Sequence, residues 1–366
     1  MHAKVVIGPR VRKSPFFDDT ITAGADQFTI YNHMYMPSGF GDPLGDYWQL
    51  INSVAMWDVS CERQVQLSGP DAGQLADYLS TRDLLNCEIG IGKYAPMTNY
   101  LGYLINDPVA QRIEEDVYWL SIADNDQLFA AQAIAAERCL RVEVSEPDVS
   151  PLAIQGPKSF DVTATLLGDW VRDLRYFHFR ASEIEGIPLI VARSGWSKQG
   201  GFELYLRDGK RGHDLWQLVK EAGAPYGIKA GNPNAIERIE SGLVNFGSDN
   251  DDCTDPFEMG LDAFIDLDND RDFIGKKPLL EIAKRGPKRG RVGLFLDGAP
   301  LAGNEQKYPI EQNGKVVGLL NAHTFSPRLE RNIAIALLNR EIPDDGLSAA
   351  LPDGRRNVQV TTLPFI

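Results

Sequence analysis

One order of elements occurs twice in the first half of this chain, and it limits the possible folds more than any other feature. Residues 63–80, RQVQLSGPDAGQLADYLS, predict a strand, a Gly-Pro break and a helix that begins near Asp71. Residues 150–168, SPLAIQGPKSFDVTATLLG, predict the same order. The glycines of the two breaks, Gly69 and Gly156, lie 87 residues apart. This repeat predicts two similar α+β units packed together rather than a solenoid.

The chain after this repeat changes in character near residue 284. Helices are predicted at 213–223, with Gly223 as the C-terminal cap, and at 234–243, with Asn234 as the N-cap. The basic stretch KRGPKRGR then precedes a β-rich segment, in which Asn313-Gly314 and Asp353-Gly354 predict tight hairpins. We therefore expect two regions, 1–283 and 284–366.

The charge and cysteine content exclude several classes of protein. With 366 residues and a formal net charge of −14, the chain repels phosphate backbones and anionic lipids, so we expect neither nucleic-acid nor membrane partners. The four cysteines are scattered without ligand spacing, which favours a reducing cytoplasm over a disulfide framework.

No segment has the residue spacing of a metal-binding or phosphate-binding motif. GIGKY (90–94) and FIGKK (273–277) lack the spacing of a phosphate loop. DLDNDRDFIGKK (266–277) begins like a calcium loop, but Arg271 and Lys277 stand where Gly and Glu are needed. The five histidines show no pair at metal spacing, so no metal site is expected. The acidic segment GSDNDDCTDPFEMG (247–260) is interpreted as a solvated face, with a segment that reshapes a pocket rim as the alternative.

A few polar residues lie in apolar or aromatic surroundings. In a strand that begins at Phe202, side chains alternate, so Glu203 and Tyr205 share the face opposite to Leu204. A strand Glu is usually solvated, but a buried face carrying Glu203 and Tyr205 is the alternative. Asp107 follows an apolar strand and precedes a proline, which is typical of a turn or of a site.

Several stretches together resemble the family of the glycine-cleavage aminomethyltransferase, almost from end to end. They are NHMYMP (32–37), MWDVS (56–60), LSGPDA (67–72), LINDP (104–108), LAIQGP (152–157), SGWSKQGGFELY (194–205), ERIESG (237–242), DFIGKK (272–277) and TFSPRL (324–329). Within the family, SGWSKQGGFE is a specific match to the dimethylsulfoniopropionate demethylases. Aminomethyltransferases usually carry His where Cys61 stands and Tyr where Trp196 stands.

The resemblance implies an α+β fold of three domains in a cloverleaf around a central folate channel. Two α+β folate-binding units come from the first 280 or so residues, and a small β-barrel-like domain follows. It also implies that Asp107 lies near the reacting folate nitrogen and that Glu203 hydrogen-bonds the pterin edge. The other implied site residues are Tyr94, Met36 and Phe177 in the pterin slot with Ser121 nearby, and Trp196 and Tyr205 beside the methyl donor.

The resemblance further implies an enzyme that uses tetrahydrofolate as co-substrate and a small-molecule methyl donor. The expected reaction moves a methyl group from dimethylsulfoniopropionate to N5 of tetrahydrofolate, giving methylmercaptopropionate and 5-methyltetrahydrofolate. Three alternatives stay open at this stage. They are a demethylase of another donor (an amine, a betaine or an aryl methyl ether), the aminomethyltransferase of glycine cleavage, and a folate-binding protein without catalysis.

Overall fold

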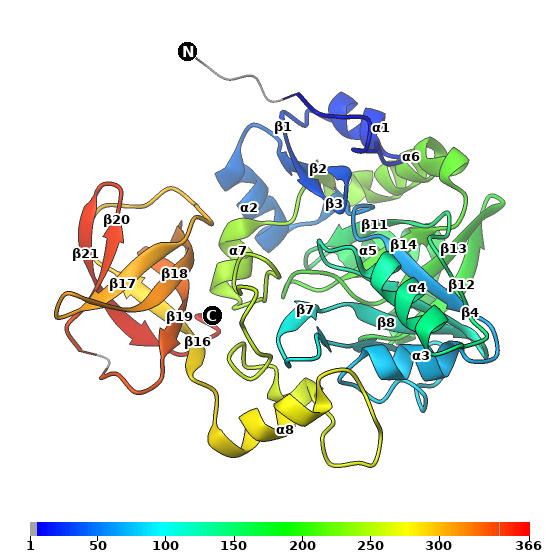
Figure 1. Ribbon diagram of the computed structural model, residues 1–366. Helices are drawn as coiled ribbons and strands as arrows, with labels where there is room; N and C mark the ends of the chain where they lie inside the picture. Colours follow the sequence, from blue (N-terminus) through cyan, green and yellow to red (C-terminus); the bar gives the residue numbers. More distant parts are fainter. Residues whose placement is uncertain (1–5, 344) are drawn as a thin grey trace.

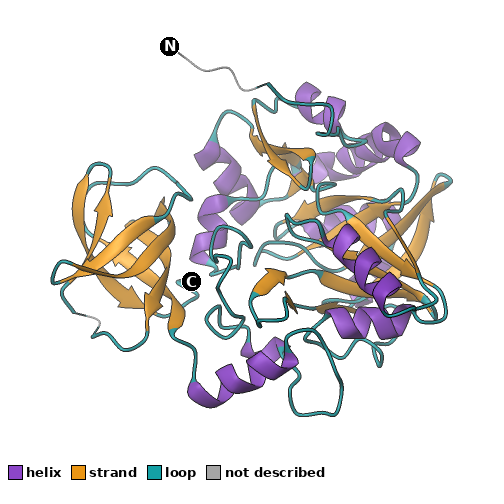
Figure 2. Cartoon of the chain, viewed as in Figure 1, coloured by secondary structure: helices purple, strands orange, loops and turns teal. Residues whose placement is uncertain are grey.

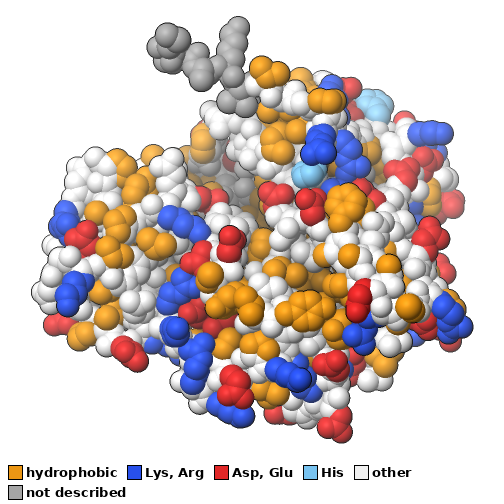
Figure 3. All heavy atoms as spheres, in the orientation of Figure 1, with side chains coloured by type: hydrophobic (Ala, Val, Ile, Leu, Met, Phe, Trp, Pro, Cys, Tyr) orange, Lys and Arg blue, Asp and Glu red, His pale blue; other side chains and the backbone are white. Residues whose placement is uncertain are grey.

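The structure is a computed structural model that describes residues 6–343 and 345–366. A small barrel lies beside a larger body that contains two main sheets (Figure 1). The barrel consists of strands and loops, whereas helices border the sheets of the larger body (Figure 2). Acidic and basic side chains are intermixed over the face drawn in Figure 3. Among the described residues, no helix combines the length and apolar character needed to cross a membrane.

The first unit is a five-stranded sheet with the order β10-β4-β9-β8-β5. Its elements are β4 (Gln64–Ser68), α3 (Ala72–Leu79), β5 (Gly92–Tyr94), β8 (Val109–Glu114), β9 (Val117–Ser121), α4 (Gln127–Glu137) and β10 (Glu143–Ser145). Leu67 of β4, Leu75 of α3 and Leu120 of β9 share one buried apolar cluster. The helix covers the sheet because its apolar residues recur every three to four positions.

The second unit is a six-stranded sheet with the order β12-β13-β14-β11-β3-β15. Its elements are β3 (Ala55–Asp58), β11 (Ser150–Gln155), α5 (Ser159–Leu167), β12 (Phe179–Ile184), β13 (Ile187–Ala192), β14 (Gly201–Leu206), α6 (Gly212–Gly223) and β15 (Lys229–Gly231). Phe202, Leu204 and Leu206 of β14 join the apolar cluster beneath α6. Glu203 and Tyr205 therefore lie on the opposite face, as the alternation predicts, and both are buried.

The predicted repeat is confirmed, because β4 leads into α3 as β11 leads into α5. Its glycines have left-handed backbones, with φ of +131° at Gly69 and +121° at Gly156. A Cβ at Gly69 would come within 2.6 Å of the Arg141 carbonyl oxygen, and one at Gly156 within 2.6 Å of the Ser53 carbonyl oxygen. Both breaks therefore require glycine for the same steric reason.

Short elements connect these sheets to each other and to the barrel. They are α1 (Phe17–Thr22), β1 (Gln27–Tyr31), β2 (Met34–Gly39), α2 (Pro43–Asn52), β6 (Met97–Thr98), β7 (Leu104–Asn106), α7 (Ala235–Glu240) and α8 (Lys276–Arg285). Asn234 caps α7 as predicted, since its side chain accepts hydrogen bonds from the backbone N–H groups of Ile236 and Glu237. The predicted cap at Gly223 is wrong: Gly223 is helical, and the left-handed residue is Gly227, after one further 3-10 turn.

The C-terminal strands form a closed barrel with the order β16-β19-β18-β17-β20-β21. Its strands are β16 (Arg289–Leu296), β17 (Tyr308–Gln312), β18 (Lys315–Ser326), β19 (Arg331–Asn339), β20 (Leu347–Leu351) and β21 (Gly354–Thr361). Asn313-Gly314 forms a two-residue hairpin loop, as predicted. The second hairpin turns one residue earlier than predicted, because Leu351 pairs with Gly354 across Pro352 and Asp353. The domain boundary near residue 284 stays a prediction.

Candidate functional site

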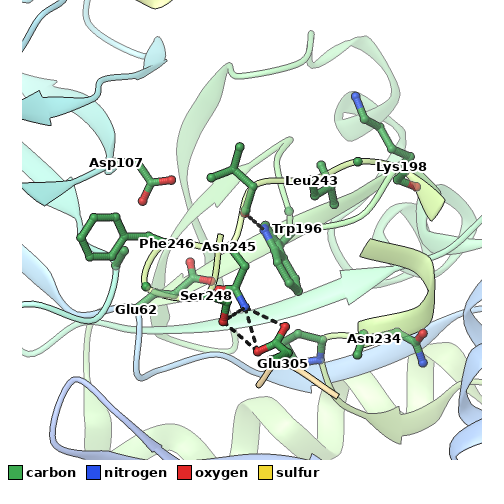
Figure 4. Close-up of a pocket in the computed structure, with 18 of the residues that line it drawn as sticks. Glu62, Asp107, Trp196, Lys198, Asn234, Leu243, Asn245, Phe246, Ser248 and Glu305 are labelled. Atoms are coloured by element: carbon green, nitrogen blue, oxygen red, sulfur yellow. Dashed lines mark hydrogen bonds between the residues drawn. The ribbon is translucent and has the colours of Figure 1, made fainter. Parts of the chain in front are cut away.

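A cavity of about 1700 Å³ lies where the sheets, the 241–248 segment and the barrel meet. All eight residues that the sequence analysis selected line it: Met36, Tyr94, Asp107, Ser121, Phe177, Trp196, Glu203 and Tyr205. They come from both sheets and from the β1-β2 ribbon, so only the tertiary fold brings them together. Figure 4 shows part of this cavity, with Asp107 and Trp196 labelled. The particular role of each residue stays a prediction.

Glu203 presents one carboxylate oxygen to the cavity. Ser194 Oγ and Tyr205 Oη both donate to Glu203 Oε2, the latter at 3.1 Å. Among the described residues, no hydrogen bond reaches Oε1. Burial raises the pKa of Glu203, and the two hydroxyl donors oppose that shift because they stabilise the charged form. The Oε1 atom of Glu203 is therefore free to accept from a ligand.

Asp107 is arranged in a similar way at the start of the β7-β8 connection. Tyr94 Oη donates to Asp107 Oδ2 at 2.6 Å, whereas Oδ1 accepts no hydrogen bond from the described part of the chain. Burial raises the pKa of Asp107 to about 7, the negative charge of Asp249 adds to the shift, and the Tyr94 hydroxyl opposes it. A carboxyl group with this pKa can accept or release a proton near neutral pH.

The loop between β13 and β14 positions Trp196. Its indole Nε1 donates to the Val244 carbonyl oxygen at 3.1 Å, which ties the loop to the 241–248 segment (Figure 4). Ser197 Oγ donates to Gln155 Oε1 at 2.8 Å, and Gln155 Nε2 donates to the Ser194 carbonyl oxygen at 3.1 Å. Val244 thus holds the indole itself, and Gln155 of β11 holds the loop on either side of it.

The remaining predicted residues are uncharged and form the walls of the cavity. Phe177 has a left-handed φ of +60° and meets the Tyr176 ring edge-on at 4.5 Å between centroids. Ser121 Oγ accepts from Gln64 Nε2 at 3.0 Å. Met36 is half-buried on β2. Together they supply aromatic and sulfur surface of the kind that suits a flat heterocycle.

Sequence reasoning missed Glu62, a third carboxylate at the cavity. Its carboxylate makes no hydrogen bond or ion pair with any described residue, and it is labelled in Figure 4. Burial raises its pKa well above the usual range, and the negative charges of Glu203 and Asp107 add to the shift. Glu62 follows β3 in an irregular turn, so no strand or helix periodicity could have selected it. Among the described residues, no group of three His, Cys, Asp or Glu side chains is placed to hold a metal ion.

The interpretation of 247–260 as a solvated face is wrong. Asp249 is fully buried and accepts from Arg238 Nη1 at 3.0 Å, while Arg291 Nη2 lies 3.1 Å from its Oδ2. Glu258, also buried, pairs with Arg289 Nη2 at 2.8 Å. The acidic segment binds the arginines at the start of the barrel, and sequence spacing alone gave no indication of these partners.

Comparison with known proteins identifies the class to which this fold and cavity belong. Residues 16–269 match the GCVT N-terminal domain, and residues 289–366 match the glycine cleavage T-protein C-terminal barrel domain. The chain therefore belongs to the glycine cleavage T-protein family, which confirms the predicted resemblance.

Individual members of that family are similar to this chain over nearly its whole length. The dimethylsulfoniopropionate demethylase DmdA of Ruegeria pomeroyi is 40% identical over 360 residues, covering 98% of each chain. The aminomethyltransferase of Thermotoga maritima is 30% identical over 354 residues, covering 94% of each. The crystal structure of the glycine cleavage system aminomethyltransferase T from Bartonella henselae matches with a TM-score of 0.84 at 21% identity, covering 97% of this chain and 98% of that one. The predicted fold is confirmed.

Proposed function

We propose that this chain is a tetrahydrofolate-dependent demethylase that transfers a methyl group from dimethylsulfoniopropionate to N5 of tetrahydrofolate. The products are methylmercaptopropionate and 5-methyltetrahydrofolate. One observation carries the proposal. The chain is 40% identical, over 98% of both lengths, to a protein named as a dimethylsulfoniopropionate demethylase, against 30% for the aminomethyltransferase of Thermotoga maritima.

The cavity suits a reduced pterin together with a second, smaller molecule. Its volume of about 1700 Å³ exceeds the roughly 300–1000 Å³ of most single-ligand pockets. A pterin presents a guanidine-like edge of N–H donors, which the free Oε1 of Glu203 can accept in a charge-assisted pair. Tyr94, Phe177 and Met36 supply apolar surface for the ring faces.

The methyl donor is a sulfonium cation, and it needs a surface that binds a cation without over-stabilising it. Trp196 and Tyr205 line the same cavity and supply aromatic faces, which attract sulfonium groups. Because the donor loses its positive charge as the methyl group leaves, a carboxylate pressed against sulfur would stabilise the ground state more than the transition state. Aromatic walls avoid that penalty.

The reaction breaks one carbon–sulfur bond and forms one carbon–nitrogen bond. The sulfur leaves as a neutral thioether, so no acid is required for its departure. N5 must shed a proton once it carries the methyl group, and Asp107, with a pKa of about 7 and a free Oδ1, accepts it. Holding both substrates in line supplies on the order of 7–11 kcal/mol of the barrier in well-aligned cases.

The test is to incubate the purified protein with tetrahydrofolate and dimethylsulfoniopropionate and to follow both products by chromatography. We expect methylmercaptopropionate and 5-methyltetrahydrofolate in equal amounts. Glycine betaine, a methylated amine and an aryl methyl ether are assayed in parallel. Greater 5-methyltetrahydrofolate formation from one of these than from dimethylsulfoniopropionate contradicts the proposed donor.

Aminomethyltransferase activity is the second candidate, and the 30% identity to the Thermotoga maritima enzyme favours testing it. The assay supplies tetrahydrofolate and an aminomethyl-lipoyl carrier protein and measures ammonia and methylenetetrahydrofolate. We expect no product. Turnover in this assay, without turnover of any methyl donor, would replace the proposed function.

A further inference from the structure

Acidic side chains outnumber basic ones among the residues that line the cavity. Six carboxylates face it among the described residues: Asp46, Glu62, Asp107, Asp124, Glu203 and Glu305. Among the described residues, only two cationic side chains line the cavity, Lys198 and Arg291. An anionic ligand group entering this cavity therefore has only these two cations to receive it among the described lining residues.

Arg291 is already committed to protein partners. Its Nη2 lies 3.1 Å from Asp249 Oδ2, and its guanidinium donates to the carbonyl oxygens of Gly242 at 3.0 Å and Leu243 at 2.8 Å. The Arg291 side chain is 6% exposed. These contacts hold Arg291 against the 241–248 segment and neutralise its charge with Asp249.

Lys198, in contrast, offers a free ammonium group. Its Nζ makes no hydrogen bond or ion pair with any residue that the structure describes, and the residue is exposed at the cavity. The backbone below it is fixed, because Lys198 N and Gln199 Nε2 both donate to the buried carboxylate of Glu237 at 3.0 Å. A rigid loop thus carries an unpaired cation to the cavity.

The place of Lys198 along this loop favours one kind of ligand. It follows Trp196 by two residues, and both residues line the cavity that Asp107 also lines (Figure 4). A molecule with its cationic end at the indole and its methyl group toward Asp107 would extend its other end toward Lys198. If that end is anionic, the ammonium neutralises it in an otherwise acidic cavity.

We propose that Lys198 binds a carboxylate group of a ligand in this cavity. The proposal rests on the proposed function, which supplies two sources of this chemistry: the propionate arm of the donor and the glutamate tail of tetrahydrofolate. Lys198 is assigned as a binding residue that selects carboxylate-bearing ligands. It takes no part in bond making or breaking.

The experiment compares Lys198→Met, which removes the charge but keeps the length, with Lys198→Arg, which keeps the charge. Lys315→Met, at the exposed Asn313-Gly314 hairpin of the barrel, is the matched control for loss of one positive charge. We expect Lys198→Met to raise one substrate KM about 10- to 100-fold, as loss of a charge-assisted hydrogen bond does. Lys198→Arg should restore most of the effect, and Lys315→Met should change nothing.

The substrate whose KM rises identifies the source of the carboxylate. If Lys198→Met raises the KM for dimethylsulfoniopropionate, and replacing the donor's carboxylate by an amide raises the KM of that variant no further, the carboxylate bound by Lys198 is the donor's. A rise for tetrahydrofolate that grows with added glutamates assigns the coenzyme tail. Unchanged KM values for both substrates overturn the proposal.

A binding measurement separates this proposal from the proposed function. Isothermal calorimetry with tetrahydrofolate and with methylmercaptopropionate requires no turnover. If the wild-type protein transfers no methyl group yet loses affinity for either carboxylate ligand in Lys198→Met, the proposed function fails and the role of Lys198 stands. Equal affinities in wild type and Lys198→Met overturn that role.

Discussion

At the scale of single residues, the site is defined by carboxylates that lack positive partners. Burial raises the pKa values of Glu62, Asp107 and Glu203, because removal from water penalises the charged form and no adjacent cation offsets the penalty. Of the three, Asp107 has a pKa of about 7, so it exchanges a proton near neutral pH. A pKa in this range suits the proton-accepting role that we propose for Asp107.

The first prediction concerns Asp107→Asn, an isosteric change that removes the proton acceptor. We expect kcat to fall about 100-fold or more, as loss of a general base does, with the KM for tetrahydrofolate changed less than about threefold. In the wild type, kcat should rise with pH through about 7 as Asp107 loses its proton, and this limb should vanish in the variant. Unchanged turnover in steady-state assays contradicts the assignment.

The same variant gives a second readout in stability. The pKa of Asp107 is higher in the folded chain than its ordinary value near 3.8, so its stabilising contribution is complete below that value and is lost as the pH rises through about 7. Asn does not titrate. The unfolding free energy of Asp107→Asn relative to wild type should therefore increase by about 1–3 kcal/mol between pH 5 and pH 8, measured by urea denaturation.

The second prediction concerns Glu203→Gln, which keeps the shape but replaces the accepting carboxylate. We expect the KM for tetrahydrofolate to rise about 10- to 100-fold with kcat at saturation changed only a few-fold, because a charge-assisted pair with the pterin edge is lost. Glu183→Gln, on the exposed face of β12, is the matched control and should behave as wild type. An unchanged KM for tetrahydrofolate places the pterin away from Glu203.

At the scale of elements, the β13–loop–β14 unit carries most of the site. The loop supplies Ser194, Trp196 and Lys198, and the strand after it supplies Glu203 and Tyr205. The alternation of β14 puts its apolar side chains in the core and leaves the polar pair for the cavity. The conformation of the loop therefore decides where Ser194, Trp196 and Lys198 lie, and the alternation of β14 decides where Glu203 and Tyr205 lie.

The third prediction tests that turn with Gly195→Ala. Gly195 has a φ of +145°, and a Cβ there would collide with the amide of Gln155, which anchors the loop. We expect the unfolding free energy to fall by about 1–3 kcal/mol and the donor KM to rise, because Trp196 is displaced. Gly186→Ala, at φ +74° with no heavy atom within 4 Å, is the control for backbone strain alone. Equal effects of the two substitutions contradict the steric argument.

At the scale of the whole molecule, buried ion pairs join the barrel to the larger body. Asp249 lies between Arg238 of α7 and Arg291 of β16, and Glu305 of the barrel accepts from Arg238 Nη2 at 2.9 Å. Nearby, Glu240 of α7 accepts from Tyr47 Oη at 3.0 Å and pairs with Arg328. The barrel thus sets the position of the 241–248 segment, and through Val244 that of Trp196.

The fourth prediction concerns Asp249→Ala, which leaves two buried arginines without their shared partner. We expect the unfolding free energy to fall by about 3–5 kcal/mol in chemical denaturation. Asp353→Ala removes a pair between exposed Asp353 and Arg356, and should lower the unfolding free energy far less than Asp249→Ala. Because the charge of Asp249 raises the pKa of Asp107, the pH limb of kcat should also move to lower pH in Asp249→Ala. A limb that stays in place contradicts this coupling.

The sequence by itself determined the local features whose causes lie within a few residues. The strand, glycine and helix order at Gly69 and Gly156, the cap at Asn234 and the loop at Asn313-Gly314 were all predicted. Strand alternation also placed Glu203 opposite Leu204, and family resemblance selected residues that line one cavity. The repeat, the cap, the hairpin loop and the strand alternation follow from backbone sterics, periodicity and short-range hydrogen bonds, whereas the cavity residues were selected by resemblance alone.

Only the tertiary structure decided which charges have partners. Asp249 is interpreted from sequence as a solvated acid, but in the structure it lies between Arg238 and Arg291. Glu62 is selected only once the fold brings it near Asp107 and Glu203. Likewise, only the structure shows that the Lys198 ammonium lines this cavity without a partner among the described residues. Electrostatic energy depends on distance and on access to water, and neither quantity between segments far apart in the chain can be read from sequence spacing.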